Sequence, residues 1–140
     1  MNRLIGVAII DQHSDHCIIK ELLETSDKEF DNALRRIFLL VLSMADDVVE
    51  ACSTNKKDDL TQIHMIDTNL DRFEDFCFRV LNKKGYHDFK QTPLMHTLVF
   101  LLELVGDEYK KIALHLLENK SNATELLKKE VAIQRDQLRR

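Results

Sequence analysis

The sequence predicts a mainly α-helical protein: an antiparallel bundle of three long helices, preceded by a small β-hairpin and followed by a fourth helix. Only three glycines and one proline in 140 residues leave few places where a helix must break. Apolar residues also recur at steps of three and four along three long stretches. The connections are short, which favours antiparallel neighbours. We expect one domain, with a β segment at 1–24 packed on a helical bundle at 25–140.

Composition also limits the function classes. The net charge of −4 gives no sign of a nucleic-acid-binding surface. No apolar stretch approaches the roughly 20 residues needed to cross a bilayer, and the N-terminus does not have the pattern of a signal peptide. Three widely spaced cysteines, Cys17, Cys52 and Cys77, are typical of reduced thiols in a cytoplasmic protein. We therefore expect a cytoplasmic protein without membrane insertion.

Two runs rich in Ile and Val, at 4–10 and 17–22, predict the strands of the hairpin. Because an isolated hairpin is only marginally stable in water, we expect it to pack on the helices. His13, Asp15 and His16 between the runs could be metal ligands. Nothing nearby completes such a site, so a polar hairpin loop is the favoured interpretation.

The first helix should begin at a capping box, Ser26 with Glu29, and end near Ser53. Its buried stripe is predicted to contain Phe30, Leu34, Ile37, Val41, Met44, Val48 and Cys52. Further apolar residues widen this stripe, which indicates neighbours on more than one side.

The second helix should be capped by Asn55 with Asp58 and should end near Gly85. Its core side is predicted to contain Leu60, Ile63, Ile66, Leu70, Phe73, Cys77 and Val80 or Leu81. Asp67 and Asp71 lie four residues apart on a flank of this stripe, and His64 and Glu74 project in nearly the same direction.

The third helix should begin at Thr92 as N-cap, followed by Pro93 at the first helical position. Its predicted stripe consists of Leu94, Leu98, Leu101, Leu102, Val105, Tyr109, Ile112 and Leu116. Glu103 and Asp107 should lie on the opposite face. Gly106 between them indicates a close neighbouring backbone or a site, because glycine inside a helix costs about 1 kcal/mol relative to alanine.

The fourth helix should be capped by Asn122 with Glu125 and should end near Leu138. The arginines at its end are interpreted as a solvated terminus that complements the helix dipole.

Two acidic pairs, Asp67 with Asp71 and Glu103 with Asp107, could carry chemistry. Each pair places two like charges about 6 Å apart at Cβ, and a cation bridging the helices would relieve their repulsion. Oxygen ligands suit magnesium, manganese or iron. The alternative is that all four carboxylates are simply solvated.

The chain has no Glu-x-x-His pair of a di-iron bundle, no Gly-rich phosphate loop and no nucleophile elbow. We therefore expect no catalysis. A carboxylate-metal oxidase is retained only as an alternative.

The stretch LELVGDEYKKIA at 102–113 resembles the most characteristic motif of the PhoU family of phosphate-uptake regulators, Leu-Glu-Arg-(Ile/Val)-(Gly/Ala)-Asp followed by Ile-Ala. IDTNLD at 66–71 looks like the second acidic signature of that family. LRRI at 34–37 and the Ile-rich runs before it are similar to the first helix and β segment of archaeal members.

The resemblance implies a helical bundle with a multinuclear metal site, often of iron, held by Asp67, Asp71, Glu103 and Asp107. His64 and Glu74 are possible additional ligands. It also implies a regulator of phosphate uptake that contacts a phosphate ABC transporter and a sensor kinase. A helical interaction module that has kept the fold without the metal is the alternative.

The chain departs from the family pattern in three respects. Longer archaeal members carry an N-terminal AbrB-like DNA-binding segment, and this chain resembles only the β segment that follows it, so a DNA-binding role is not expected. The usual member has two three-helix repeats and this chain has one, so a symmetric homodimer could rebuild the pair. Glu108 and Tyr109 stand where His-Ala is common.

Overall fold

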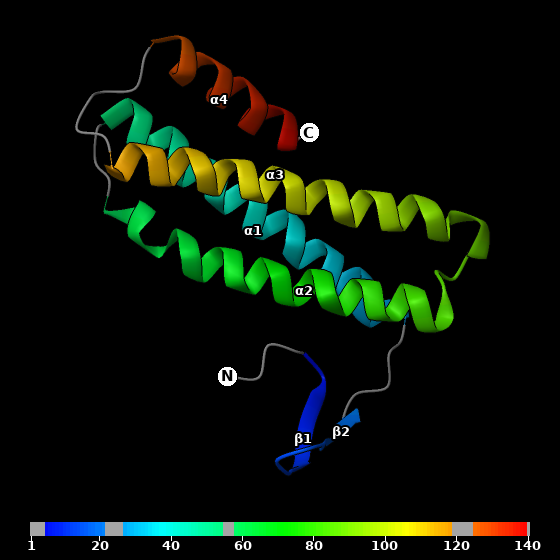
Figure 1. Ribbon diagram of the computed structural model, residues 1–140. Helices are drawn as coiled ribbons and strands as arrows, with labels where there is room; N and C mark the ends of the chain where they lie inside the picture. Colours follow the sequence, from blue (N-terminus) through cyan, green and yellow to red (C-terminus); the bar gives the residue numbers. More distant parts are fainter. Residues whose placement is uncertain (1–4, 22–26, 55–57, 119–124, 140) are drawn as a thin grey trace.

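The computed structural model describes residues 5–21, 27–54, 58–118 and 125–139, and it confirms the predicted fold class (Figure 1). The bundle consists of three long helices: α1 (Asp27–Thr54), α2 (Ile63–Lys84) and α3 (Thr92–Glu118). Short 3-10 helices, η1 (Asp59–Gln62) and η2 (Phe89–Gln91), precede α2 and α3. The hairpin is formed by β1 (Val7–Gln12) and β2 (Cys17–Glu21), and α4 (Glu125–Leu138) follows the bundle.

Helix α1 is the central element, because it packs against α2, α3 and α4. This arrangement explains the wide apolar surface expected for it. All the predicted stripe residues of α1 are buried except Leu34, which is half-buried. Helix α4 lies along the C-terminal half of α1, where Arg139 donates two hydrogen bonds to the carboxylate of Asp46 at 2.8 and 3.0 Å.

The helix boundaries agree with the sequence at the end of α2 and differ at its start. Gly85 ends α2 with φ of +76°, and its N–H donates to the Leu81 carbonyl at 2.9 Å. At the start, η1 intervenes and α2 begins only at Ile63. The expected caps at 26, 55 and 122 lie outside the described residues.

Thr92 is the first residue of α3, and its hydroxyl accepts a hydrogen bond from the backbone N–H of Tyr86 at 2.9 Å. The side chain therefore ties the connection between α2 and α3 to the start of the helix.

The predicted buried face of α3 is wrong in part. Leu94, Leu101 and Val105 are 61%, 50% and 37% exposed. The residues that are buried follow a different line along the helix, and they are Val99, Leu102, Gly106, Tyr109, Ala113 and Leu116. Helix α3 carries apolar residues on two adjacent arcs of its surface. One arc is buried in the core, and the other remains exposed.

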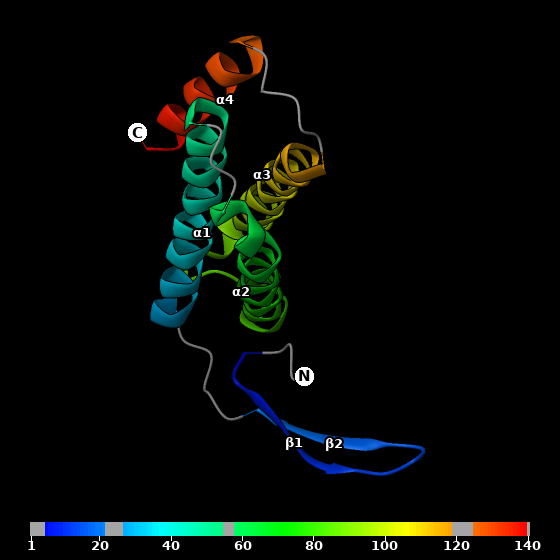
Figure 2. The ribbon, with the colours of Figure 1, turned by 90° about the vertical axis from the view of Figure 1, so that its left-hand side faces the viewer.

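The hairpin lies apart from the helices, in contrast to the expected packing. Both views show β1 and β2 projecting away from the bundle (Figures 1 and 2). Ile9, Ile10, Ile18 and Ile19 are each at least half exposed. The link to the bundle runs through Ile5, which packs partly against the core and whose carbonyl accepts a hydrogen bond from Arg79.

Cys52 and Cys77 are buried, Cys17 is exposed, and all three are free thiols. Burial raises the pKa of the Cys77 thiol to about 12, so it stays protonated and behaves as a small apolar core residue. Within the described part of the chain, no helix combines the length and apolar character that a membrane span requires.

Two adjacent leucines of α3 test which face is buried. Leu102 is 5% exposed and Leu101 is 50% exposed. Leu102→Ala should therefore lower the free energy of unfolding by about 2–5 kcal/mol, since it leaves a cavity. Leu101→Ala should cost only about 1 kcal/mol, because half of its surface is already in water. Urea denaturation of the two variants measures the difference. Equal losses would show that the helix is rotated relative to this description.

Candidate functional site

Helices α2 and α3 approach each other closely at Gly106. A Cβ at this position would overlap the Cδ2 atom of Leu70. Leu70 is a buried residue with an exposed fraction of 1%. The sequence predicted a close neighbouring backbone or a site at this glycine. The close neighbour is instead a side chain, that of Leu70, because an added Cβ would meet Leu70 side-chain atoms and no backbone atom of α2. The absence of a side chain at Gly106 thus sets the spacing of the two helices at this level.

The acidic residues are arranged symmetrically around this contact. On α2, Asp67 and Asp71 lie three residues before and one after Leu70; on α3, Glu103 and Asp107 lie three before and one after Gly106. The two helices run in opposite directions (Figure 1). The two predicted pairs therefore face each other across the line along which α2 and α3 meet, and each influences the other's charge. The surface formed by these four carboxylates and Glu74 is called the acidic groove from here on.

One end of the acidic groove is compensated by a lysine. Lys110 donates from Nζ to the Asp67 carboxylate at 2.6 Å and lies 3.6 Å from the Asp107 carboxylate. Asp67 is 7% exposed and is the buried charged residue of the described chain. The hydrogen bond to Asp67 is the main cause that raises the pKa of Lys110. This end therefore contains an ion pair between the two helices in which Asp67 is buried and Lys110 is half-buried.

The other end has like charges on both sides. Burial, followed by the neighbouring charges of Glu103, Asp75, Asp71 and Asp107, raises the pKa of Glu74 to about 7. Burial, followed by Asp107, Asp71 and Asp67, also raises the pKa of Glu103. In an antiparallel helix pair, the residue four positions after the contact residue of one helix lies opposite the residue three positions before the contact residue of the other helix. Asp67 consequently meets a lysine, whereas Glu103 meets a second glutamate, Glu74.

Two placements on this surface were not expected. Glu103 and Asp107 are half-buried on the flank of α3 that faces α2, and not opposite the buried face of the helix. His64 is exposed, and it is not among the charges that shift the pKa of Glu74 or Glu103.

Lys110 is not among the residues that the sequence pattern singles out. The signal was present, because Lys110 follows Asp107 by three residues and so shares its face.

The groove offers oxygen ligands, the type that hard cations prefer. Three of its five carboxylates come from α2 and two from α3. Among the residues described, however, no three His, Cys, Asp or Glu side chains are arranged to hold one metal ion. In the hairpin loop, His13 and His16 instead bond to Asp11 and Asp15 at 3.1 and 2.8 Å, and all four side chains are more than half exposed.

No protein-family model, curated protein or solved structure matches this chain.

The ion pair of Lys110 with Asp67 can be tested through the free energy of unfolding. Lys110→Met leaves the Asp67 carboxylate buried without its cation, which should lower the free energy of unfolding by about 1–3 kcal/mol. Lys111→Met is the matched control, because Lys111 pairs with Glu108 at 2.7 Å where both side chains are more than half exposed, and it should cost less than about 1 kcal/mol. Adding Asp67→Asn to Lys110→Met should recover part of the loss. Equal effects of the two lysine variants would contradict the buried role of Lys110.

Glu74 gives a pH test. Its pKa in the folded protein, about 7, lies above the ordinary value of 4.5. Between these values the folded state holds a proton that the unfolded state has lost, so stability should fall as the pH rises through this window. Glu74→Gln should make this fall smaller and should stabilise the protein at pH 8 relative to the parent.

Urea denaturation at pH 5 and pH 8 measures this effect. Glu118→Gln, at an exposed position on α3, is the control and should leave the pH dependence unchanged. A pH dependence that Glu74→Gln also leaves unchanged would show that Glu74 does not titrate in this window.

Proposed function

We propose that this protein is a non-enzymatic regulator of phosphate transport, PhoU-like in type, which binds a metal cation in the acidic groove and acts through contacts with other proteins. The observation that carries the proposal is the juxtaposition of Glu74 and Glu103 across the groove, with Asp71 and Asp107 beside them. The pKa values of both glutamates are raised. Carboxylates that repel one another in a half-buried groove are stabilised by a cation.

The end of the groove at which Glu74 faces Glu103 is the place for the cation. Lys110 neutralises Asp67 at the other end, and its side chain would not need to move. The carboxylates of Asp71, Glu74, Glu103 and Asp107 would have to rotate towards a common point. All four side chains are partly exposed, so packing in the core does not fix their conformations. Iron, manganese and magnesium are the metals that this donor set suits.

Metal content tests the first part of the proposal. The parent protein, refolded with manganese or ferrous iron and then desalted, should retain metal when measured by mass spectrometry. Glu103→Gln combined with Asp107→Asn should abolish this retention while keeping the helical circular dichroism, because neither residue belongs to the core.

The matched control for charge is Glu118→Gln combined with Glu130→Gln, two exposed residues outside the groove. It should retain metal like the parent. Equal metal content in the groove variant and the parent would refute the assignment.

A second candidate function is a helical interaction module without metal. The ion pair of Lys110 with Asp67 favours it, because a protein ammonium already bridges the helices. A proton on Glu74 could relieve the repulsion at the other end, since its pKa is about 7. A parent protein that takes up no metal during refolding would make this the better account.

The apolar surface left open on α3 supports contact with a second copy of the chain. A groove of about 540 Å³ lies between α3 and α4. Its apolar lining comes from Leu101, Leu104, Val105, Tyr109, Ile112 and Leu138. Leu94, 61% exposed, lies two turns before Leu101 on the same helix. Such a surface on a single repeat is suited to a symmetric homodimer.

Light scattering tests self-association. The parent should be a dimer at tens of micromolar protein, roughly the range in which a specific interface persists. Leu101→Asp should shift it to monomer. Met65→Asp, at a 59% exposed apolar position on α2, is the control and should remain a dimer. A parent that is monomeric under these conditions would contradict the homodimer.

The regulatory role itself is tested in cells that carry the chain. Loss of the protein should change phosphate uptake, and the groove variant should fail to restore it. Cross-linking should capture components of a phosphate transporter or a sensor kinase. Normal uptake after loss of the protein would contradict the role.

A further inference from the structure

Helix α4 is attached to the bundle chiefly through α1. Among the described residues, α1 is the one element with Cα atoms within 8 Å of those of α4. Both views show α4 beside the C-terminal end of α1 (Figures 1 and 2). Val131 is the buried residue of α4, at 2% exposed, and Leu127 and Leu138 are partly buried. Elements with few buried apolar contacts open locally at a low cost in free energy.

Two arginines of α4 meet one carboxylate of α1, that of Asp46. Arg139 donates to both of its oxygens at 2.8 and 3.0 Å, and Nε of Arg135 lies 4.0 Å from it. Arg135 also lies 2.7 Å from its neighbour Asp136, so its charge is shared between two carboxylates. The side chains of Asp46 and Arg139 are 38% and 52% exposed. Ion pairs at such positions add little stability, and salt weakens them.

A buried hydroxyl beside these ion pairs lacks a hydrogen-bond partner. Tyr109 of α3 is 2% exposed, and its Oη has no partner among the described residues. Burial is the main cause that raises the pKa of Tyr109, and the charges of Arg135 and Asp46 also act on it, so its phenol lies near both. An unpaired buried hydroxyl destabilises the arrangement that buries it. Movement of α4 away from α1 would return this hydroxyl to water.

Cys52 of α1 lies close to α4 and can report on its position. It is 5% exposed, near the end of α1. Burial is the main cause that raises the pKa of its thiol, and the charge of Lys128 on α4 lowers it. Because Lys128 lies near Cys52 and Arg135 lies near Asp46, α4 runs antiparallel to α1 and covers it from 46 to 52.

We propose that α4 detaches from α1 as a unit while α1, α2 and α3 stay folded, and that the ion pairs at Asp46 control how often it does so. The three long helices pack against one another in every pairing, so their core does not require α4. Detachment uncovers α1 around Cys52. It also removes the wall that Gln134, Gln137 and Leu138 give to the groove between α3 and α4. Helix α4 is thus a removable cover over the C-terminal half of α1, independent of the metal and of the homodimer proposed above.

Thiol labelling with N-ethylmaleimide, followed by mass spectrometry of peptides, tests the opening. Cys17 is exposed and should react at once, so it is the internal standard. Cys52 and Cys77 are 5% and 0% exposed, and both need an opening to react. In the parent, Cys52 should react at least about tenfold faster than Cys77, which lies in the core and requires global unfolding. Low concentrations of urea should accelerate Cys77 steeply and Cys52 only weakly, since local opening exposes less surface.

Three variants identify the opening as that of α4. Asp46→Asn removes the charge that both arginines meet and should speed the labelling of Cys52 by about threefold. Val131→Ala removes part of the buried anchor and should also speed it, by about fivefold or more. Glu50→Gln removes a like charge at an exposed position of α1 and should leave the rate unchanged.

Two results would overturn the proposal. In the first, Cys52 reacts as slowly as Cys77 and with the same dependence on urea, so α4 leaves only when the whole chain unfolds. In the second, Cys52 reacts fast but neither Asp46→Asn nor Val131→Ala changes its rate, which would assign the opening to fraying of the last turn of α1.

Discussion

The contact between Gly106 and Leu70 sets the geometry on which the candidate groove depends. With no side chain on Gly106, Leu70 packs directly against α3, and the two helices come close at this level. Acidic residues flank the contact at equal distances along both helices. Close packing of apolar residues thus brings like charges together, because the chain cannot separate the carboxylates without separating the helices. A bundle selected for stability alone would avoid such an arrangement, and local conflicts of this kind are concentrated at functional sites.

The two ends of the groove resolve this conflict differently. At one end Lys110 meets Asp67, and the ion pair between them joins α3 to the buried carboxylate of α2. At the other end Glu74 meets Glu103, and the raised pKa of Glu74 shows that the groove favours a proton there. A cation and a proton compete for the same negative charge. The metal binding proposed for this end should therefore weaken below neutral pH, as expected for any site whose ligands must lose protons.

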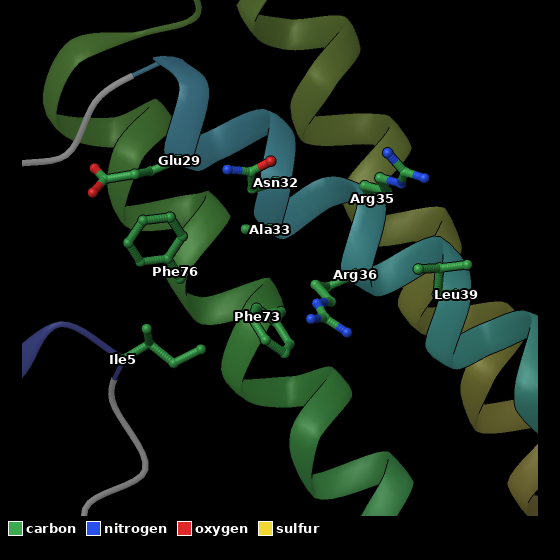
Figure 3. Close-up of a pocket in the computed structure, with 9 residues that line it drawn as sticks. All are labelled: Ile5, Glu29, Asn32, Ala33, Arg35, Arg36, Leu39, Phe73 and Phe76. Carbon is green, nitrogen blue, oxygen red and sulfur yellow. The ribbon is translucent and has the colours of Figure 1, made fainter.

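The sequence was sufficient for the helices and for the stripe of α1, because these follow from local periodicity. It was insufficient for α3. That helix carries apolar residues on two adjacent arcs, and only the positions of α1 and α2 decide that Val99 and Ala113 are buried while Leu94 and Leu101 are not. The partner of Lys110 lies 43 residues away and is reached across the groove. The cavity of about 590 Å³ shown in Figure 3 likewise combines residues of α1 and α2 with Ile5, which no local pattern predicts.

The most direct test of the central claim is an NMR titration of the isotopically labelled parent with manganese. The paramagnetic ion broadens the signals of nuclei near it. If the facing carboxylates form the site, substoichiometric manganese should first broaden the backbone amides of 71–74 on α2 together with those of 103–107 on α3, and should leave the hairpin and α4 sharp. Broadening of only one helix, or broadening that begins in the hairpin loop around His13 and His16, would contradict the account.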